Sequence, residues 1–253
     1  MQFELNKGGK VIYIANFLTE EFVKQLWNEL KIQKIYNEPT KIKNKQSEKI
    51  EVEGTFGESK SGIKWIQYIA DSYNKLISYP RLSTIMVSPY DKKKDYVNSD
   101  TTEMPEIDWT PCMKYLKEHI EKSFNEKISY ALLHEYRDTS NYLGYHSDRE
   151  LSPKDKIYSI SLGIKRRFGF REKFNSDGSI KKSGPADFEL FLESGSLIIF
   201  DFDVGCKNYK HSLFKGLKSE GHTCMDKNKD SICPSKLDWC GCTRINITFR
   251  TFY

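Results

Sequence analysis

The segment Arg244-Ile245-Asn246-Ile247-Thr248-Phe249-Arg250 alternates strictly between polar and apolar residues. In a β-strand, successive side chains point to opposite faces of the sheet. The two arginines, the asparagine and the threonine therefore share one face, and the two isoleucines and the phenylalanine share the other. The segment predicts a strand that is polar on one side and packed against a core on the other.

The two arginines of this strand suggest a binding site for an anion. They stand six positions apart, so their Cα atoms lie ~20 Å apart on an extended strand. Guanidinium groups that converge from those positions leave a gap of about 7 Å, which fits a small dicarboxylate. Guanidinium forks pair with carboxylates through two parallel hydrogen bonds. A ladder of polar side chains on a solvated sheet face is the alternative interpretation.

Short apolar or alternating runs recur upstream of this strand, with turn residues between most of them. Such a pattern is typical of a β-sandwich or barrel. The runs cover residues 128–136, 157–163, 168–171, 188–192 and 197–202.

The first half of the chain mixes helix and strand signals. Val11–Ile14 predicts a short strand, and Thr19 and Thr110-Pro111 each predict the start of an amphipathic helix. The polar residues 37–62 predict a loop or mobile arm, and Pro80-Arg81 predicts a break in the following segment. We therefore expect an α+β protein.

Two regions are expected along the chain, packed as one compact unit. An N-terminal α/β cover with a polar loop spans residues 1–79, and a β-rich core spans residues 80–253. Within the core, residues 88–108 predict an exposed excursion and residues 212–243 a cysteine-rich insertion.

Composition limits the function classes. The 253 residues carry a net charge of +5, which permits a polyanionic partner without requiring one. Aromatic residues make up 13% of the chain, which argues against disorder. No apolar run approaches the roughly 18 residues of a membrane span. The first residues do not resemble a signal peptide, so we expect an intracellular protein, cytoplasmic or nuclear, without membrane association.

A His-x-Asp pair, His146 and Asp148, follows Asn141-Tyr142-Leu143-Gly144-Tyr145. On a strand the two side chains would share a face and could offer a nitrogen and an oxygen to one metal ion. Two His and one carboxylate leave open positions on iron for a cosubstrate and dioxygen. Among the remaining histidines, His211 is the best third ligand, because His119 lies on the amphipathic helix. An ordinary surface pair is the alternative for His146 and Asp148.

Taken together, these motifs resemble the AlkB-like family of iron(II)/2-oxoglutarate dioxygenases. The resemblance runs from about Pro80 to the C-terminus. It rests on the order of the motifs as well as on the final Arg-x-Asn-x-Thr-x-Arg signature. The matching segments are Pro80-Arg81, His134–Asp138, Gly144, His146–Asp148, Ser159–Gly163, Phe168–Arg171, Gly195–Leu197, His211 and Arg244–Arg250.

The resemblance implies a double-stranded β-helix, or jelly roll, that holds iron inside. It implies that His146, Asp148 and His211 bind Fe(II). Further residues would bind 2-oxoglutarate, and one of them, His134, stands where the family has Asn. The implied 2-oxoglutarate residues are Tyr136, Arg244, Asn246, Arg250 and His134.

The implied reaction converts 2-oxoglutarate to succinate and carbon dioxide and hydroxylates a substrate C–H bond. A methyl group on a nucleobase nitrogen would then leave as formaldehyde, from DNA or RNA. Glu150 would help to read the base, Tyr90 and Tyr96 could stack on it, and two basic runs would contact phosphates. These runs are Lys92-Lys93-Lys94 and Lys165-Arg166-Arg167, of which Arg166 is the predicted substrate residue.

Other interpretations remain at this stage. The basic runs are also typical of solvated loops, and Glu150 of a surface position. A hydroxylase or demethylase of a protein or small molecule is the enzymatic alternative. A catalytically silent binding module is the alternative from another class, but it would have no need for an intact set of ligands and arginines.

The insertion between His211 and Arg244 is dense in cysteine. Cys224, Cys233, Cys240 and Cys242 are the candidate ligands of a structural zinc ion, with His222 in reserve. A polar loop of this kind cannot form its own core, and a metal ion would supply one. Free or partly paired cysteines are the alternative.

Overall fold

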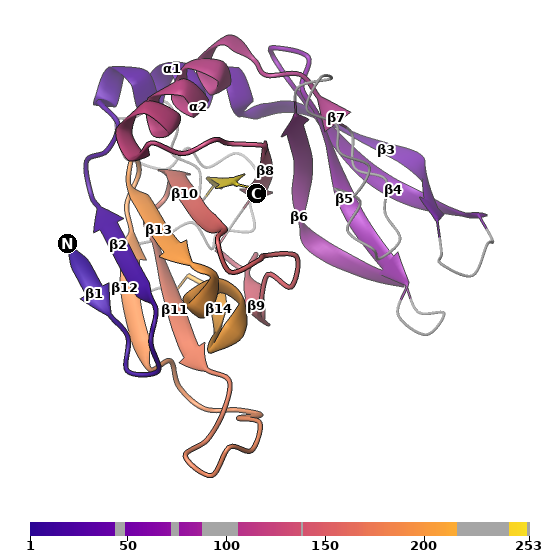
Figure 1. The fold of residues 1–253 in the computed structure, drawn as a ribbon. Coiled ribbons are helices and arrows are strands. Elements are labelled where there is room, and N and C mark those ends of the chain that lie inside the picture. Colours follow the sequence, from indigo (N-terminus) through magenta and orange to yellow (C-terminus); the bar gives the residue numbers. More distant parts are fainter. Residues whose placement is uncertain (44–48, 72–75, 88–105, 138, 217–242, 252–253) are drawn as a thin grey trace.

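The computed structural model describes residues 1–43, 49–71, 76–87, 106–137, 139–216 and 243–251. Within this part of the chain, the strands form one 11-stranded and one 4-stranded sheet (Figure 1). Neither described helix has the length and apolar character that a bilayer crossing requires.

The larger sheet has the order β1-β2-β13-β10-β15-β8-β6-β5-β4-β3, with β7 beside β6. All of these strand pairings are antiparallel except that of β6 with β7. Its strands are β1 (Gln2–Glu4), β2 (Lys10–Ile14), β3 (Ile32–Lys43), β4 (Lys49–Ser59), β5 (Lys64–Asp71), β6 (Leu76–Val87), β7 (Glu106–Ile107), β8 (Tyr130–Tyr136), β10 (Lys156–Gly163), β13 (Leu197–Asp201) and β15 (Arg244–Arg250).

The smaller sheet has the order β12-β11-β14-β9. Its strands are β9 (Leu143–His146), β11 (Arg166–Glu172), β12 (Phe188–Leu192) and β14 (Tyr209–Leu213). From β8 to β15 the chain passes repeatedly between this sheet and the neighbouring strands β8, β15, β10 and β13 of the larger one. This connectivity is the expected double-stranded β-helix, and the expected α+β class is confirmed.

Two helices cover the outer face of the larger sheet. They are α1 (Glu20–Leu30) and α2 (Pro111–Phe124), which lie side by side in Figure 1. Thr19 caps α1 by accepting the backbone N–H of Phe22, as its position predicts. A single apolar cluster joins the helices to the outward side chains of the sheet, including Leu26, Leu116, Ile245 and Ile247. A second cluster, which includes Phe170, Ile198 and Phe200, fills the space between the sheets.

The prediction of a loop over residues 37–62 is wrong. Strands β3 and β4 form a long hairpin there, which extends the larger sheet away from the jelly roll (Figure 1). The sequence does carry a signal for it, since Ile50 and Val52 alternate with Glu51 and Glu53.

The predicted break at Pro80-Arg81 is also wrong, because β6 runs through both residues. Pro has no N–H to donate and is tolerated where a strand lacks regular pairing. The pairing of β6 with β5 shifts register between Ser78 and Leu82, and its pairing with β8 begins at Leu82. Pro80 therefore lies where neither neighbour requires its donor. The boundary expected between residues 79 and 80 falls inside this strand.

Glu135 is a buried acid on the helix side of β8. Its side chain points to the same face as Leu133, which belongs to the apolar cluster under the helices. The residue is 5% exposed, and its Oε2 accepts the backbone N–H of Ile32 at 3.3 Å. Burial raises the pKa of Glu135 to about 7. The folded state therefore holds this proton more tightly than the unfolded chain does.

Replacement of Glu135 by Gln is expected to stabilise the protein at high pH. The wild type loses stability as pH rises from about 4.5 to about 7, because the unfolded state releases the proton first. The variant lacks this loss and should gain up to about 3 kcal/mol at pH ~8, with little difference at pH ~4. Urea unfolding at both pH values measures the effect, with the exposed Glu118→Gln as control. An equal change at both values would contradict the titration of Glu135.

Candidate metal and cosubstrate site

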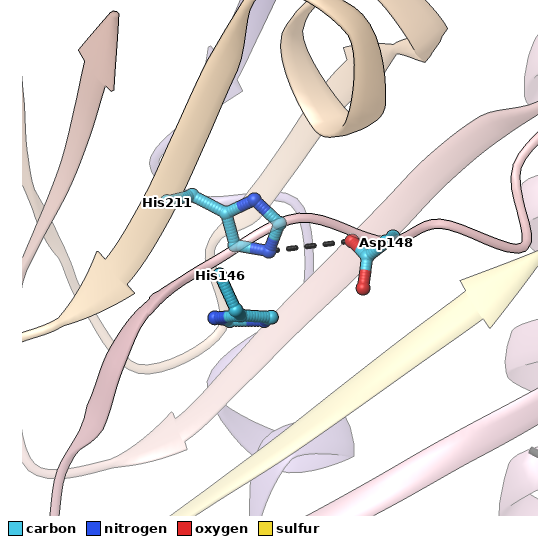
Figure 2. A group of neighbouring side chains, drawn as sticks. All are labelled: His146, Asp148 and His211. Carbon is cyan, nitrogen blue, oxygen red and sulfur yellow. Dashed lines mark ion pairs between the residues drawn. The ribbon is translucent and has the colours of Figure 1, made fainter. Parts of the chain in front are cut away.

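His146 and His211 lie directly opposite each other on the paired strands β9 and β14. Their ring centroids are 4.2 Å apart. Asp148 follows two residues after His146, just beyond the end of β9 (Figure 2). One candidate ligand atom from each of the three side chains lies within 4.8 Å of the others. The structure thus brings together the three residues that the sequence analysis selected as iron ligands.

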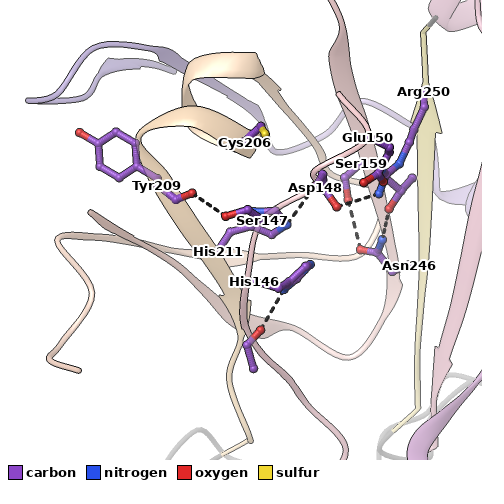
Figure 3. Close-up of polar contacts among 12 residues, drawn as sticks. His146, Ser147, Asp148, Glu150, Ser159, Cys206, Tyr209, His211, Asn246 and Arg250 are labelled. Carbon is purple, nitrogen blue, oxygen red and sulfur yellow. Dashed lines mark hydrogen bonds and ion pairs between the residues drawn. The ribbon is translucent and has the colours of Figure 1, made fainter. Parts of the chain in front are cut away.

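The short segment that carries Asp148 is fixed by backbone contacts. The Asp148 N–H donates to the carbonyl of Gly205 at 3.0 Å. The Ser147 hydroxyl donates to the carbonyl of Tyr209 at 3.1 Å (Figure 3). Gly205 belongs to a π-helical turn, η1 (Asp203–Lys207), directly before β14. The same turn thus helps to place Asp148 and leads into the strand of His211.

The donor set fits a divalent metal ion. The Nδ1 of His146 donates to the carbonyl of Gly144 at 2.9 Å, which leaves Nε2 as the metal-binding atom. Burial and the neighbouring His211 lower the pKa of His146 to about 4, so the imidazole is neutral at pH 7. Burial opposes ionisation of Asp148, but the charges of Arg250 and His211 outweigh it and hold the pKa of Asp148 below its usual range. Two imidazoles and one carboxylate are a suitable ligand set for non-haem Fe(II).

Aromatic rings enclose His211. The ring centroids of Phe168, Phe170 and Phe200 lie 5.8, 6.3 and 5.3 Å from its own. His211 is 5% exposed, so this side of the candidate metal site is shielded from water.

Arg250 joins the candidate metal ligands to the larger sheet. Its Nη2 lies 3.0 Å from Oδ1 of Asp148, and its Nη1 contacts Oε1 of Glu150. Arg250 is 4% exposed. Glu150 therefore lies against Arg250, at the edge of the candidate site.

Arg244 begins a hydrogen-bonded row along the inner face of β15. Its Nη2 donates to Ser161 Oγ at 2.9 Å and to Asn246 Oδ1 at 2.7 Å. Asn246 also accepts from Ser159 at 3.1 Å and donates to Thr248 at 2.7 Å. The polar face predicted for this strand is confirmed, but it is buried inside the jelly roll rather than solvated. Tyr136 lies beside it, with its ring centroid 5.6 Å from the Arg244 guanidinium carbon.

A family model described as the 2OG-Fe(II) oxygenase superfamily matches residues 10–250. The chain belongs to this superfamily. Its members use Fe(II) and 2-oxoglutarate, and the ligand set and arginines described above fit both.

The chain is also similar to curated AlkB relatives. DNA oxidative demethylase ALKBH2 of Homo sapiens is 32% identical over 107 residues, 42% of this chain and 40% of that protein. The Arabidopsis thaliana ALKBH2 is 28% identical over 157 residues, 55% of this chain and 43% of that protein. The alpha-ketoglutarate-dependent dioxygenase alkB homolog 3 of Rattus norvegicus is 26% identical over 160 residues, 62% of this chain and 47% of that protein. Each match spans less than half of the relative's length.

His134, which replaces the Asn of the AlkB pattern, lies opposite Asn246 on β15 and Ser83 on β6. Its Nδ1 is 2.6 Å from Ser83 Oγ. Burial, followed by the charge of Arg81, holds the pKa of His134 well below its ordinary value. The imidazole is therefore neutral and can donate or accept a hydrogen bond toward the interior of the site.

The prediction that Arg166 contacts substrate is wrong. The residue is fully buried, and its Nη2 donates to the carbonyl of Asn141 at 2.7 Å and to that of Phe214. Its burial follows from alternation, because Arg166 shares a face of β11 with the inward Phe168 and Phe170. Arg166 thus connects the segment before β9 with the segment after β14.

Several other predicted residues lie outside the described part of the chain. They are the substrate candidates Tyr90 and Tyr96, the Lys92-Lys93-Lys94 run, the zinc candidates Cys224, Cys233, Cys240 and Cys242, and His222. Their proposed roles remain predictions.

The side chains that support the candidate site residues were not among those predicted from the sequence. Ser83 contacts His134, and Ser159 and Ser161 hold Asn246 and Arg244. Ser159 and Ser161 alternate with Tyr158 and Ile160, so period-two spacing could have placed both hydroxyls on one face. No comparable signal points to Ser83, because its role depends on the register of β6 against β8.

Removal of one ligand is expected to abolish metal binding without unfolding the protein. His211→Ala should weaken Mn(II) binding beyond the roughly 10- to 100-fold that loss of an outer partner costs. Calorimetric titration with Mn(II) measures this, and the far-UV circular dichroism spectrum checks the fold. His119→Ala, on α2, is the matched control. Wild-type affinity in the His211 variant would show that the metal binds elsewhere.

Proposed function

We propose that the chain is an Fe(II)- and 2-oxoglutarate-dependent dioxygenase that removes N-linked methyl groups from nucleobases in DNA or RNA. The observation that carries the proposal is the joining of the His146, Asp148 and His211 group to the arginines of β15 through the Asp148–Arg250 ion pair. The similarity to proteins named DNA oxidative demethylase supports the substrate class.

His146 and His211, on the paired strands β9 and β14, and Asp148, just beyond β9, would hold Fe(II). Fe(II) bound there, together with 2-oxoglutarate and dioxygen, supplies the oxidation that hydroxylates a substrate C–H bond. Arg250 keeps Asp148 ionised and close to its partners, since the buried carboxylate would otherwise favour its neutral form. The phenylalanines around His211 limit the access of water.

Arg244 is suited to hold the carboxylate of 2-oxoglutarate that is remote from the metal. Arg250, at the other end of β15, already contacts a metal ligand, whereas Arg244 lies six residues away beside Tyr136. Ser161 and Asn246 fix the Arg244 guanidinium before any ligand arrives, which lowers the entropy that binding would cost. His134 and Asn246 offer further hydrogen bonds between the two arginines.

The overall reaction consumes dioxygen, 2-oxoglutarate and the methylated base, and no protein side chain is used up. One dioxygen and one 2-oxoglutarate give succinate, carbon dioxide and one oxygen atom inserted into the methyl C–H bond. The C–N bond of the resulting N-hydroxymethyl group then breaks: its electron pair returns to the base nitrogen, the hydroxyl group loses its proton, and formaldehyde leaves. The substrate base must be unstacked to reach the buried site, as in other enzymes that act on bases.

Turnover on oligonucleotides is the direct test of this function. Fe(II)-loaded protein should form succinate and formaldehyde in equal amounts from single-stranded DNA or RNA that carries N-methylated adenine or cytosine. Unmethylated oligonucleotides and the His211→Ala variant are the controls. Mass spectrometry of the oligonucleotide and quantitation of succinate measure the products. Succinate formation that no oligonucleotide stimulates would instead favour a hydroxylase of proteins or small molecules, and absence of any succinate would favour a binding module.

Arg244→Lys is expected to weaken the binding of 2-oxoglutarate. An ammonium group carries the charge but cannot form the two-bond fork to a carboxylate. The loss should be on the order of 1.5–3 kcal/mol, or roughly tenfold or more in affinity. Calorimetric titration of 2-oxoglutarate into Mn(II)-loaded protein measures it, with the exposed Arg149→Lys as control. Unchanged affinity in the Arg244 variant would place the cosubstrate elsewhere.

A further inference from the structure

Ser83 and His134 form a polar pair inside the jelly roll. They lie directly opposite each other on the paired strands β6 and β8, and Ser83 Oγ is 2.6 Å from His134 Nδ1. Ser83 is fully buried, and His134 is 7% exposed. Within the described residues, this contact is the one hydrogen bond that either side chain makes.

The Ser83 hydroxyl determines which nitrogen of His134 carries the hydrogen. Burial and the neighbouring arginines keep the imidazole neutral, so only one of its two nitrogens is protonated. If Nδ1 donated to Ser83 Oγ, the hydroxyl hydrogen would have no acceptor among the described residues. A buried donor without an acceptor retains the full cost of its lost hydration. If the hydroxyl donates to Nδ1 instead, both groups are satisfied, and the hydrogen of the imidazole is on Nε2.

The Nε2–H group of His134 belongs to the polar interior of the jelly roll. His134 lies opposite Asn246 on β15, so both side chains point to the inner face of the sheet. No described residue accepts a hydrogen bond from Nε2. Arg81, Arg250 and Arg244 lie near enough for their charges to act on this imidazole. An uncharged donor therefore stands among three cations, where an oxygen of an anionic ligand is the complementary partner.

We propose that Ser83 is a positioning residue, whose hydroxyl fixes His134 in the Nε2–H tautomer and so makes it a hydrogen-bond donor to an oxygen of 2-oxoglutarate. This inference rests on the proposed binding of 2-oxoglutarate between Arg244 and Arg250. The other tautomer would present the lone pair of Nε2 to that oxygen, and two lone pairs repel each other.

The need for Ser83 follows from the presence of His at position 134. Asn, the residue of the AlkB pattern, has an amide nitrogen that always carries hydrogens and requires no partner to define it as a donor. An imidazole becomes a defined donor only when its other nitrogen accepts a hydrogen bond. The hydroxyl of Ser83 is therefore expected to matter only while position 134 is His.

Ser83→Ala is expected to weaken the binding of 2-oxoglutarate about two- to tenfold, because one hydrogen bond loses its fixed donor. Calorimetric titration of 2-oxoglutarate into Mn(II)-loaded protein measures the affinity, and Ser83→Thr, which keeps the hydroxyl, should restore most of it. Ser59→Ala is the matched control, since Ser59 is also buried and its Oγ accepts the N–H of Ile63, in a turn outside the site. Unchanged affinity in Ser83→Ala would overturn the proposal.

A double variant separates the positioning of His134 from a loss of packing. In a His134→Asn background, Ser83→Ala should leave the affinity for 2-oxoglutarate unchanged, because the amide donor does not depend on the hydroxyl. An equal loss in both backgrounds would mean that Ser83 supports the strand rather than the imidazole, and it would also overturn the proposal.

The tautomer itself can be measured without 2-oxoglutarate. NMR of protein with isotope-labelled histidine, loaded with diamagnetic Zn(II), distinguishes a protonated ring nitrogen from an unprotonated one, and His134→Asn identifies the signals by their loss. The wild type should carry the hydrogen on Nε2, and Ser83→Ala should show a mixture of both tautomers. A hydrogen on Nδ1 in the wild type contradicts the proposal. If the tautomer is as expected but the wild type binds no 2-oxoglutarate, the proposed cosubstrate site fails instead.

Discussion

The buried ion pair between Asp148 and Arg250 connects the two sheets of the jelly roll. Asp148 extends from β9 of the small sheet, and Arg250 ends β15 of the large one. Neither charge could be buried alone, because the loss of hydration would favour the neutral form or an open structure. Their pairing fixes the metal ligand against the strand that carries the predicted cosubstrate residues. The candidate metal site and the proposed cosubstrate site are therefore joined by one ion pair.

The polar interior depends on the helices outside. Strand β15 places Arg244, Asn246 and Arg250 inside the jelly roll, where they contribute little to hydrophobic stability. Its other face places Ile245 and Ile247 under α1 and α2, in the larger apolar cluster. The burial of that face offsets the cost of a charged interior. The same alternation thus serves stability on one side and chemistry on the other.

Much of this arrangement could be predicted from local pattern. Alternation identified β15, and the His-x-Asp spacing pointed to two candidate ligands on one short segment. Local sequence pattern gave wrong predictions where the structure depends on the pairing register between strands that are distant in the sequence. Arg166 is part of a basic run in the sequence. It lies two residues before Phe168 on β11, however, so its side chain points to the same inward face and is buried. The β3–β4 hairpin looked like a loop, because its charged residues conceal a period of two. Ser83 could not be found at all, since only the pairing of β6 with β8 brings it to His134.

The replacement of Asn by His at position 134 shows how register preserves chemistry. An amide side chain offers both a donor and an acceptor, and so does a neutral imidazole. A protonated imidazole would offer only donors, but burial and the nearby arginines keep His134 neutral. Ser83, directly opposite on β6, occupies Nδ1 and leaves Nε2 for the interior. The departure from the family pattern therefore still leaves one ring nitrogen able to donate or accept a hydrogen bond, because burial, together with the site's positive charge, keeps the imidazole unprotonated.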